Sequence, residues 1–144
     1  MKRASLALGV ALVASAQAQE RPTPSAYEFD KPGVLAQQLL WGVVHGVRLL
    51  ALACHRRGDT AATDAYVDWL DAQWPRVRAA ESELSRHYFR RGQAPMEAID
   101  NALKLKPELA QSDAELGEAC ATLPAALATP RYDLESYYRE KLKR

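Results

Sequence analysis

The sequence predicts an all-α protein, an antiparallel bundle of four to five helices held together by one disulfide bond. Three observations support this fold class. Apolar residues recur at helical spacings of three and four positions through most of the chain. No alternation of apolar and polar residues is long enough for a useful strand. The chain also contains two cysteines, Cys54 and Cys120, each in an apolar neighbourhood.

Residues 1–18 have the pattern of a secretory signal peptide. A basic start, Lys2 and Arg3, precedes a short apolar run and a small-residue cleavage site that ends at Ala18. We therefore expect export to the periplasm or the cell exterior, with cleavage near Ala18. Because Lys2 and Arg3 are the only charged residues of this segment, cleavage changes the formal net charge from +1 to −1. This balance argues against nucleic acid as the main partner.

The remaining chain is expected to have no transmembrane segment, because no stretch reaches roughly 18 uninterrupted apolar residues. Residues 35–54 come closest, but polar side chains interrupt them, namely Gln37, Gln38, His45 and Arg48. Residues 19–31 contain two prolines and no clear period, which predicts an irregular lead-in. A single helical bundle domain is expected over residues 32–144.

The first helix is expected to begin near Pro32, with Asp30 as its cap. Its apolar residues cover most of its circumference, which predicts a central helix surrounded by others. Gly42 and Gly46 lie four residues apart on this helix. Because glycine has no side chain, this pair is expected to let another helix pack closely against it.

The Arg-Gly-Asp sequence at residues 57–59 has two interpretations. As an adhesion motif it would need a flexible exposed loop and an integrin partner. As a helix boundary, Gly58 follows the end of the first helix and Asp59 or Thr60 caps the second. We favour the boundary, because it explains each residue where it stands.

The second helix is expected to continue to Arg91 and to stop at Gly92, with a kink or break after Trp74 where Pro75 interrupts it. A third helix is expected to start at Pro95 and to use Met96, Ile99 and Leu103, with Leu105 as a further candidate before Pro107.

Two further helices complete the expected bundle. Ser112 and Glu115 have the spacing of a capping box and open the fourth helix, after which Pro124 and Pro130 punctuate the chain. Asp133 is expected to cap a final helix over residues 134–143.

Cys54 and Cys120 are expected to form a disulfide bond, because an even cysteine count in a small exported protein favours pairing. The bond would join the central helix to the fourth helix and close a long loop. On the chain-entropy estimate, such a loop stabilises the fold by at most about 4 kcal/mol.

Four residues are candidate metal ligands: His45, His55, Glu83 and His87. Glu83 and His87 have the helical spacing that two ligands of one metal can share, but a zinc site normally needs three or four protein ligands. The sequence contains no CxxC, HExxH or CxxCH pattern. We therefore assign no cofactor, and a periplasmic metal- or small-ligand-binding bundle stands as the alternative function.

Catalytic motifs are not evident in the sequence. It has no GxSxG nucleophile elbow and no phosphate-binding glycine loop. Several carboxylates could pair across a cleft, but on helices such groups usually face solvent. No catalytic residue is assigned, and a cell-envelope hydrolase is the third functional possibility.

Aromatic and arginine side chains gather near the expected helix ends, and these residue types dominate protein-binding hot spots. We predict an exported, non-enzymatic protein-binding factor, such as an inhibitor, immunity-like, chaperone or secretion accessory protein, whose partner is another protein of the cell envelope or periplasm. In the simpler interpretation, these side chains only cover the bundle ends and pair with local acids. The candidate contact residues are Trp69, Trp74, Arg78, Tyr88, Arg90 and Tyr137.

Overall fold

The computed structural model describes residues 26–144, and over this range the protein is all-helical. The predicted helical bundle with one disulfide is confirmed. The proposed signal peptide and most of the proposed lead-in lie outside the described residues. The elements are α1 (Pro32–Arg56), α2 (Thr60–Phe89), α3 (Met96–Ala102), α4 (Asp113–Leu127), the short 3-10 helix η1 (Pro130–Tyr132) and α5 (Leu134–Leu142).

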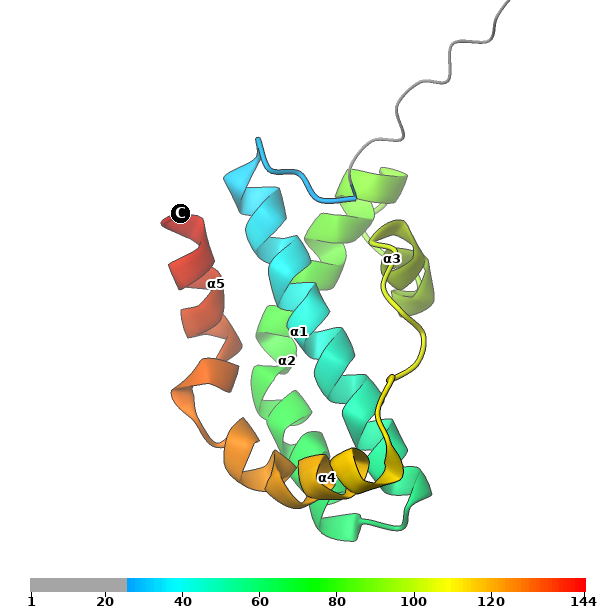
Figure 1. The fold of residues 1–144 in the computed structure, drawn as a ribbon. Helices are drawn as coiled ribbons and strands as arrows, with labels where there is room; N and C mark the ends of the chain where they lie inside the picture. Colours follow the sequence, from blue (N-terminus) through cyan, green and yellow to red (C-terminus); the bar gives the residue numbers. More distant parts are fainter. Residues whose placement is uncertain (1–25) are drawn as a thin grey trace, which may run out of the picture.

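Helices α1 and α2 form a long antiparallel hairpin around which the other elements are arranged (Figure 1). Helix α4 crosses the end of the hairpin where α1 turns into α2, and α5 then returns along α1. Helix α3 lies against the opposite end of α2. The central position of α1 follows from its apolar circumference, since α2, α4 and α5 all pack on it.

The turn between α1 and α2 confirms the helix-boundary interpretation of residues 57–59. Gly58 has a φ of +76°, a left-handed conformation that favours glycine. The Asp59 carboxylate accepts a hydrogen bond from the Ala62 backbone N–H at 3.0 Å and so caps α2. Arg57 forms an ion pair with Asp113 at 3.2 Å. The three residues are therefore used within the fold.

The disulfide joins α1 to α4. Cys54 and Cys120 have a Cα–Cα distance of 5.5 Å. Both side chains are buried, with exposed fractions of 0% and 2%. The predicted pairing is confirmed, and it holds the crossing helix against the C-terminal end of the central helix.

The predicted break after Trp74 does not occur, and Pro124 does not end its helix either. Helix α2 runs unbroken from Thr60 to Phe89 with Pro75 inside it. Proline removes the hydrogen bond to the carbonyl four residues earlier. That carbonyl belongs to Asp71, and because Asp71 and Pro75 are both exposed, water can satisfy it. Helix α4 likewise continues past Pro124 to Leu127.

Several predicted helix ends also differ from the structure. Lys31, not Asp30, is the N-cap residue of α1, and no side chain caps this end. Helix α2 ends before Gly92, because Arg90 already adopts a left-handed conformation with a φ of 55°. Helix α3 ends at Ala102 and does not reach Leu105.

The other predicted caps are confirmed. Ser112 and Glu115 form a reciprocal capping box at the start of α4. Asp133 caps α5 by accepting a hydrogen bond from the Ser136 backbone N–H at 2.9 Å. Because these interactions are local, the sequence spacing alone predicts them.

Within the described residues, α1 is the helix whose length and composition would allow it to cross a membrane. In its most apolar window, 50% of the residues are buried inside the protein. A core helix of a soluble protein passes the same test, so α1 is compatible with the expected lack of a transmembrane segment.

Candidate functional site

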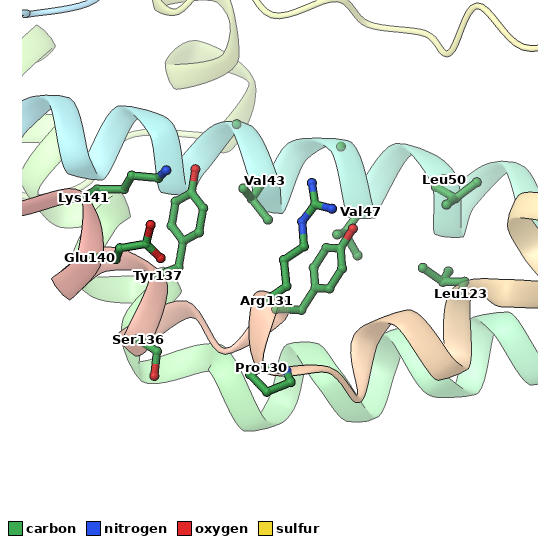
Figure 2. Close-up of a pocket in the computed structure, with 13 residues that line it drawn as sticks. Val43, Val47, Leu50, Leu123, Pro130, Arg131, Ser136, Tyr137, Glu140 and Lys141 are labelled. Atoms are coloured by element: carbon green, nitrogen blue, oxygen red, sulfur yellow. The ribbon is translucent and has the colours of Figure 1, made fainter. Parts of the chain in front are cut away.

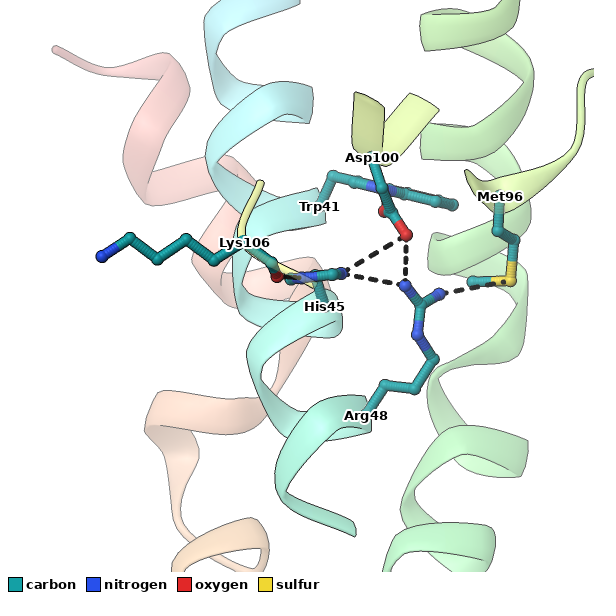
Figure 3. A network of polar contacts seen from close by, with 6 residues as sticks. All are labelled: Trp41, His45, Arg48, Met96, Asp100 and Lys106. Atoms are coloured by element: carbon teal, nitrogen blue, oxygen red, sulfur yellow. Dashed lines mark hydrogen bonds and ion pairs between the residues drawn. The ribbon is translucent and has the colours of Figure 1, made fainter. Parts of the chain in front are cut away.

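A polar network closes the side of α1 that faces α3 (Figure 3). The Asp100 carboxylate on α3 accepts hydrogen bonds from Trp41 Nε1 at 2.8 Å and from Arg48 Nη2 at 2.5 Å. Arg48 also contacts the sulfur of Met96 at 3.5 Å. The Asp100 and Arg48 side chains are 14% and 19% exposed, so the ion pair is largely removed from water. The network holds α3 against the central helix.

His45 completes this network through both of its ring nitrogens. Its Nε2 lies 2.7 Å from the Lys106 backbone oxygen, which can only accept a hydrogen bond, so Nε2 carries the proton. Its Nδ1 lies 2.9 Å from Arg48 Nη2 and 3.4 Å from an Asp100 carboxylate oxygen. Both ring nitrogens are therefore occupied, and His45 anchors the chain that follows α3.

The four candidate metal ligands do not come together. Among the described residues, no group of three or more His, Cys, Asp or Glu side chains could hold a metal ion. His55 is exposed at the end of α1. Glu83 pairs with Arg86 at 2.9 Å, and His87 Nε2 lies 3.2 Å from a Glu28 carboxylate oxygen.

Two of the candidate contact residues instead have structural roles. Trp69 is 6% exposed, and its indole N–H donates to the Tyr132 backbone oxygen at 2.8 Å. The Tyr88 hydroxyl donates to the Ala26 backbone oxygen at 2.9 Å and accepts from the Gln38 amide at 2.6 Å. Burial is the main cause that raises the pKa of Tyr88. These two aromatic residues hold segments of the fold together.

Three other candidates lie on the exposed surface of α2 or directly after it. Trp74 is 42% exposed, and the Arg78 guanidinium lies 5.8 Å from the centre of its ring. Arg78 also pairs with Glu81 at 3.2 Å. Arg90 is exposed at the end of α2. The sixth candidate, Tyr137, lies on α5 and lines a groove to which none of the other five belongs.

This groove, which we call the α1–α5 groove, has a volume of about 780 Å³. Figure 2 shows α1 along one side and η1 and α5 along the other, with Leu123 of α4 at one end. On the α1 side, the groove is lined by small or apolar residues, namely Gly42, Val43, Gly46, Val47 and Leu50. The side chains of Arg131, Tyr137 and Lys141 extend toward α1 from the opposite side.

The two glycines of α1 face open space in this groove. A Cβ atom added at Gly42 or at Gly46 would meet no atom within 4 Å. The expectation that another helix of this chain packs closely on this pair is therefore wrong. Helix α5 is held away from the glycines, and the missing side chains widen the groove.

The rim of the α1–α5 groove carries two cations, Arg131 and Lys141. Arg131 and Lys141 form no ion pair with any residue in the described part of the chain. Lys141 Nζ lies 5.0 Å from the centre of the Tyr137 ring. The nearby Glu140 pairs with Arg144 at 3.1 Å. The groove therefore presents positive charge beside an apolar floor.

The Tyr137 hydroxyl is neutral over the physiological range. Burial is the main cause that raises its pKa above the ordinary value of 10.0, and the negative charge of Glu140 acts in the same direction. Arg131 and Arg144 oppose this effect, which places the Arg131 charge close enough to influence the groove. Tyr137 can therefore donate a hydrogen bond to a bound acceptor.

Of the residues that line the groove, the sequence predicts only Tyr137 as a contact residue. The glycine pair was recognised, and its position on an apolar helix was the available signal. The sequence cannot place Arg131 and Lys141 in the groove, because their position depends on how η1 and α5 lie beside α1.

No known protein family, curated protein or solved structure matches this chain.

Proposed function

We propose that this protein is an exported, non-enzymatic binding factor that holds a segment of another protein in the α1–α5 groove. The observation that carries the proposal is the groove itself, with two glycines on its floor and two cations on its rim. Interfaces between proteins combine an apolar centre with a polar rim, and tyrosine and arginine are frequent in their hot spots. The groove offers this combination.

The buried disulfide supports the proposed location outside the cytoplasm, since disulfides persist in oxidising compartments. An inhibitor, immunity-like protein, chaperone or secretion accessory protein acts by binding alone. A groove on rigid helices suits such a role, because α1 is fixed on its other sides by α2, α4 and the network around Asp100.

Site-specific photocrosslinking in the exporting native host tests this proposal. Replacing Tyr137 with p-azidophenylalanine changes the side chain little and places the reactive group in the groove. We expect one reproducible crosslinked protein from this position. Trp74 is the matched control, because it is also a partly exposed aromatic residue but lies outside the groove. A product from position 74 and none from position 137 would move the binding surface to α2.

A blocked groove provides the second control. Gly46→Trp fills the floor, and we expect it to remove the crosslinked product from position 137. Gly92→Trp adds the same side chain in an exposed segment where nothing lies within 4 Å, and it should leave the product unchanged. Thermal melting checks that both variants are folded. Persistence of the product in the Gly46→Trp variant would contradict the proposal.

A further inference from the structure

We infer that the segment held in the α1–α5 groove is an amphipathic α-helix with small or apolar residues on one face and carboxylates along its edge. This inference rests on the proposed function and specifies the chemistry of its partner. Three observations support it: the shape of the groove floor, the backbone hydrogen bonds of α1 and the two rim cations without a carboxylate partner among the described residues.

The shape of the floor fits the side of a helix. Gly42 and Gly46 are one helical turn apart, and space remains open above both. Small residues at this spacing let the backbone of a second helix approach closely. From Gly42 to Leu50 the floor spans about 12 Å, which is about two turns of a bound helix.

The backbone hydrogen bonds of α1 favour a helix over an extended peptide as the ligand. An extended peptide gains affinity by adding a strand to a sheet edge with free N–H and C=O groups. The floor lies inside α1, whose backbone groups are already paired within the helix, and no sheet occurs in the described residues. A helix arrives with its own backbone hydrogen bonds satisfied and needs only side-chain contacts.

The open side of the groove argues against a small molecule as the main ligand. Small-molecule sites usually enclose most of the ligand surface. Here Gly46 on the floor is exposed, as are Pro130, Arg131 and Glu140 on the opposite wall. A ligand in the groove therefore keeps one side in water, as the polar face of an amphipathic helix does.

The charges of the rim define the polar edge of the bound helix. Arg131 and Lys141 both extend toward α1, and Tyr137 lies between them (Figure 2). Because neither cation has a carboxylate partner among the described residues, acidic side chains on the ligand would complement them. Glu140 also lines the groove, but it pairs with Arg144, and the two groove cations exceed its single negative charge.

Binding of designed peptides to the full chain tests this inference. The probe is a helical peptide of about 15 residues, long enough for helix formation, with Ala and Leu on one face and Glu along one edge. We expect saturable shifts of the Gly42 and Gly46 amide signals in NMR spectra. A peptide with Lys in place of each Glu should bind about tenfold more weakly.

Charge reversal provides the sharpest form of the test. The double variant Arg131→Glu/Lys141→Glu should bind the acidic peptide about tenfold more weakly and should restore binding of the Lys peptide. Arg56→Glu/Arg91→Glu makes the same change in net charge outside the groove and should alter neither affinity. Equal losses in the two double variants would show only a general charge effect and would overturn the inference.

Other occupants would give different results. Shifts of the two glycine signals with a fatty-acid anion or with anionic phospholipid vesicles, but not with the peptide, would overturn the inference in favour of a lipid. Self-association that Gly46→Trp abolishes would identify a second copy of this chain. A crosslinked partner at position 137 without peptide binding would overturn only the inference that the bound segment is a helix. If neither a crosslinked partner nor peptide binding is observed, the proposed function is overturned as well.

Discussion

The two sides of helix α1 are built from neighbouring residues but are used in opposite ways. Trp41 and His45 enter the network that closes the side facing α3. Gly42 and Gly46, each the next residue in the chain, face the open α1–α5 groove. A rotation of about 100° per residue is enough to separate a sealed face from an open one.

This difference shows how a small bundle can keep an open binding surface without losing its rigidity. Trp41, His45 and Arg48 follow one stripe of α1 and tie it to Asp100 and the chain after α3. The stripe with Gly42 and Gly46 makes no comparable contact. The closed side fixes the helix, so the open side can keep its shape while empty.

The largest effect should come from removing the disulfide, which holds α4 and so supports one end of the groove. Cys54→Ala/Cys120→Ala removes a link between residues 66 positions apart. We expect the free energy of unfolding to fall by about 4 kcal/mol, because the unfolded chain gains entropy. Urea denaturation measures the change. An unchanged midpoint, or two free thiols in the wild-type protein, would contradict this prediction.

The next largest effect should come from breaking the closed side. Asp100→Ala leaves the Trp41 indole N–H and the Arg48 guanidinium without their shared acceptor. We expect a loss of about 3 kcal/mol in the free energy of unfolding. Asp113→Ala is the matched control, because Asp113 also pairs with an arginine but its side chain is 99% exposed. Its loss should stay below about 1 kcal/mol, and equal losses would refute the proposed role of the network.

Added side chains should have opposite effects on the two kinds of α1 surface. Gly42→Ala and Gly46→Ala should each stabilise the free protein by about 0.5–1 kcal/mol, because alanine favours helices and the space is open. Ala36→Leu, at a position with 0% exposure on the same helix, should destabilise it by about 1–3 kcal/mol. Thermal melting compares the three variants, and destabilisation by both glycine substitutions would show that the groove is not open.

The smallest effect concerns the charge of the groove. Glu140→Gln should lower the pKa of Tyr137, because Glu140 raises it, whereas Arg131→Ala should raise it further. Tyrosinate absorbance or NMR titration measures both changes. Because the folded-state pKa lies above the unfolded value of 10.0, Tyr137 stabilises the fold below this pH, and that contribution is lost as pH rises through the folded-state pKa. Shifts in the same direction for both variants would contradict this arrangement.

Local chemistry explains which parts of the fold were predictable. The start of α1 near Pro32, the glycine turn at Gly58, the cap at Asp59 and the capping box at Ser112 depend on residues close in sequence. The disulfide was predictable because two cysteines allow only one intramolecular pairing. The fold class followed from these signals and from the helical period of the apolar residues.

The remaining features depend on tertiary contacts that spacing does not reveal. Pro75 looks like a helix breaker, but α2 continues through it, at an exposed position where water can satisfy the freed carbonyl. Trp69 looks like a contact residue, yet it reaches the Tyr132 backbone across the fold. The groove could not be predicted from sequence, because it depends on the distance of α5 from Gly42 and Gly46, which is set by tertiary packing.

The bond between Cys54 and Cys120 turns part of the chain into a covalent ring with two tails. Nearly all of α1 belongs to the N-terminal tail, and η1 and α5 belong to the C-terminal tail. A single proteolytic cut in the connection between α3 and α4 would therefore open the ring without releasing either fragment. The nicked molecule would still carry both tails on one covalent assembly, and only a reductant would separate them.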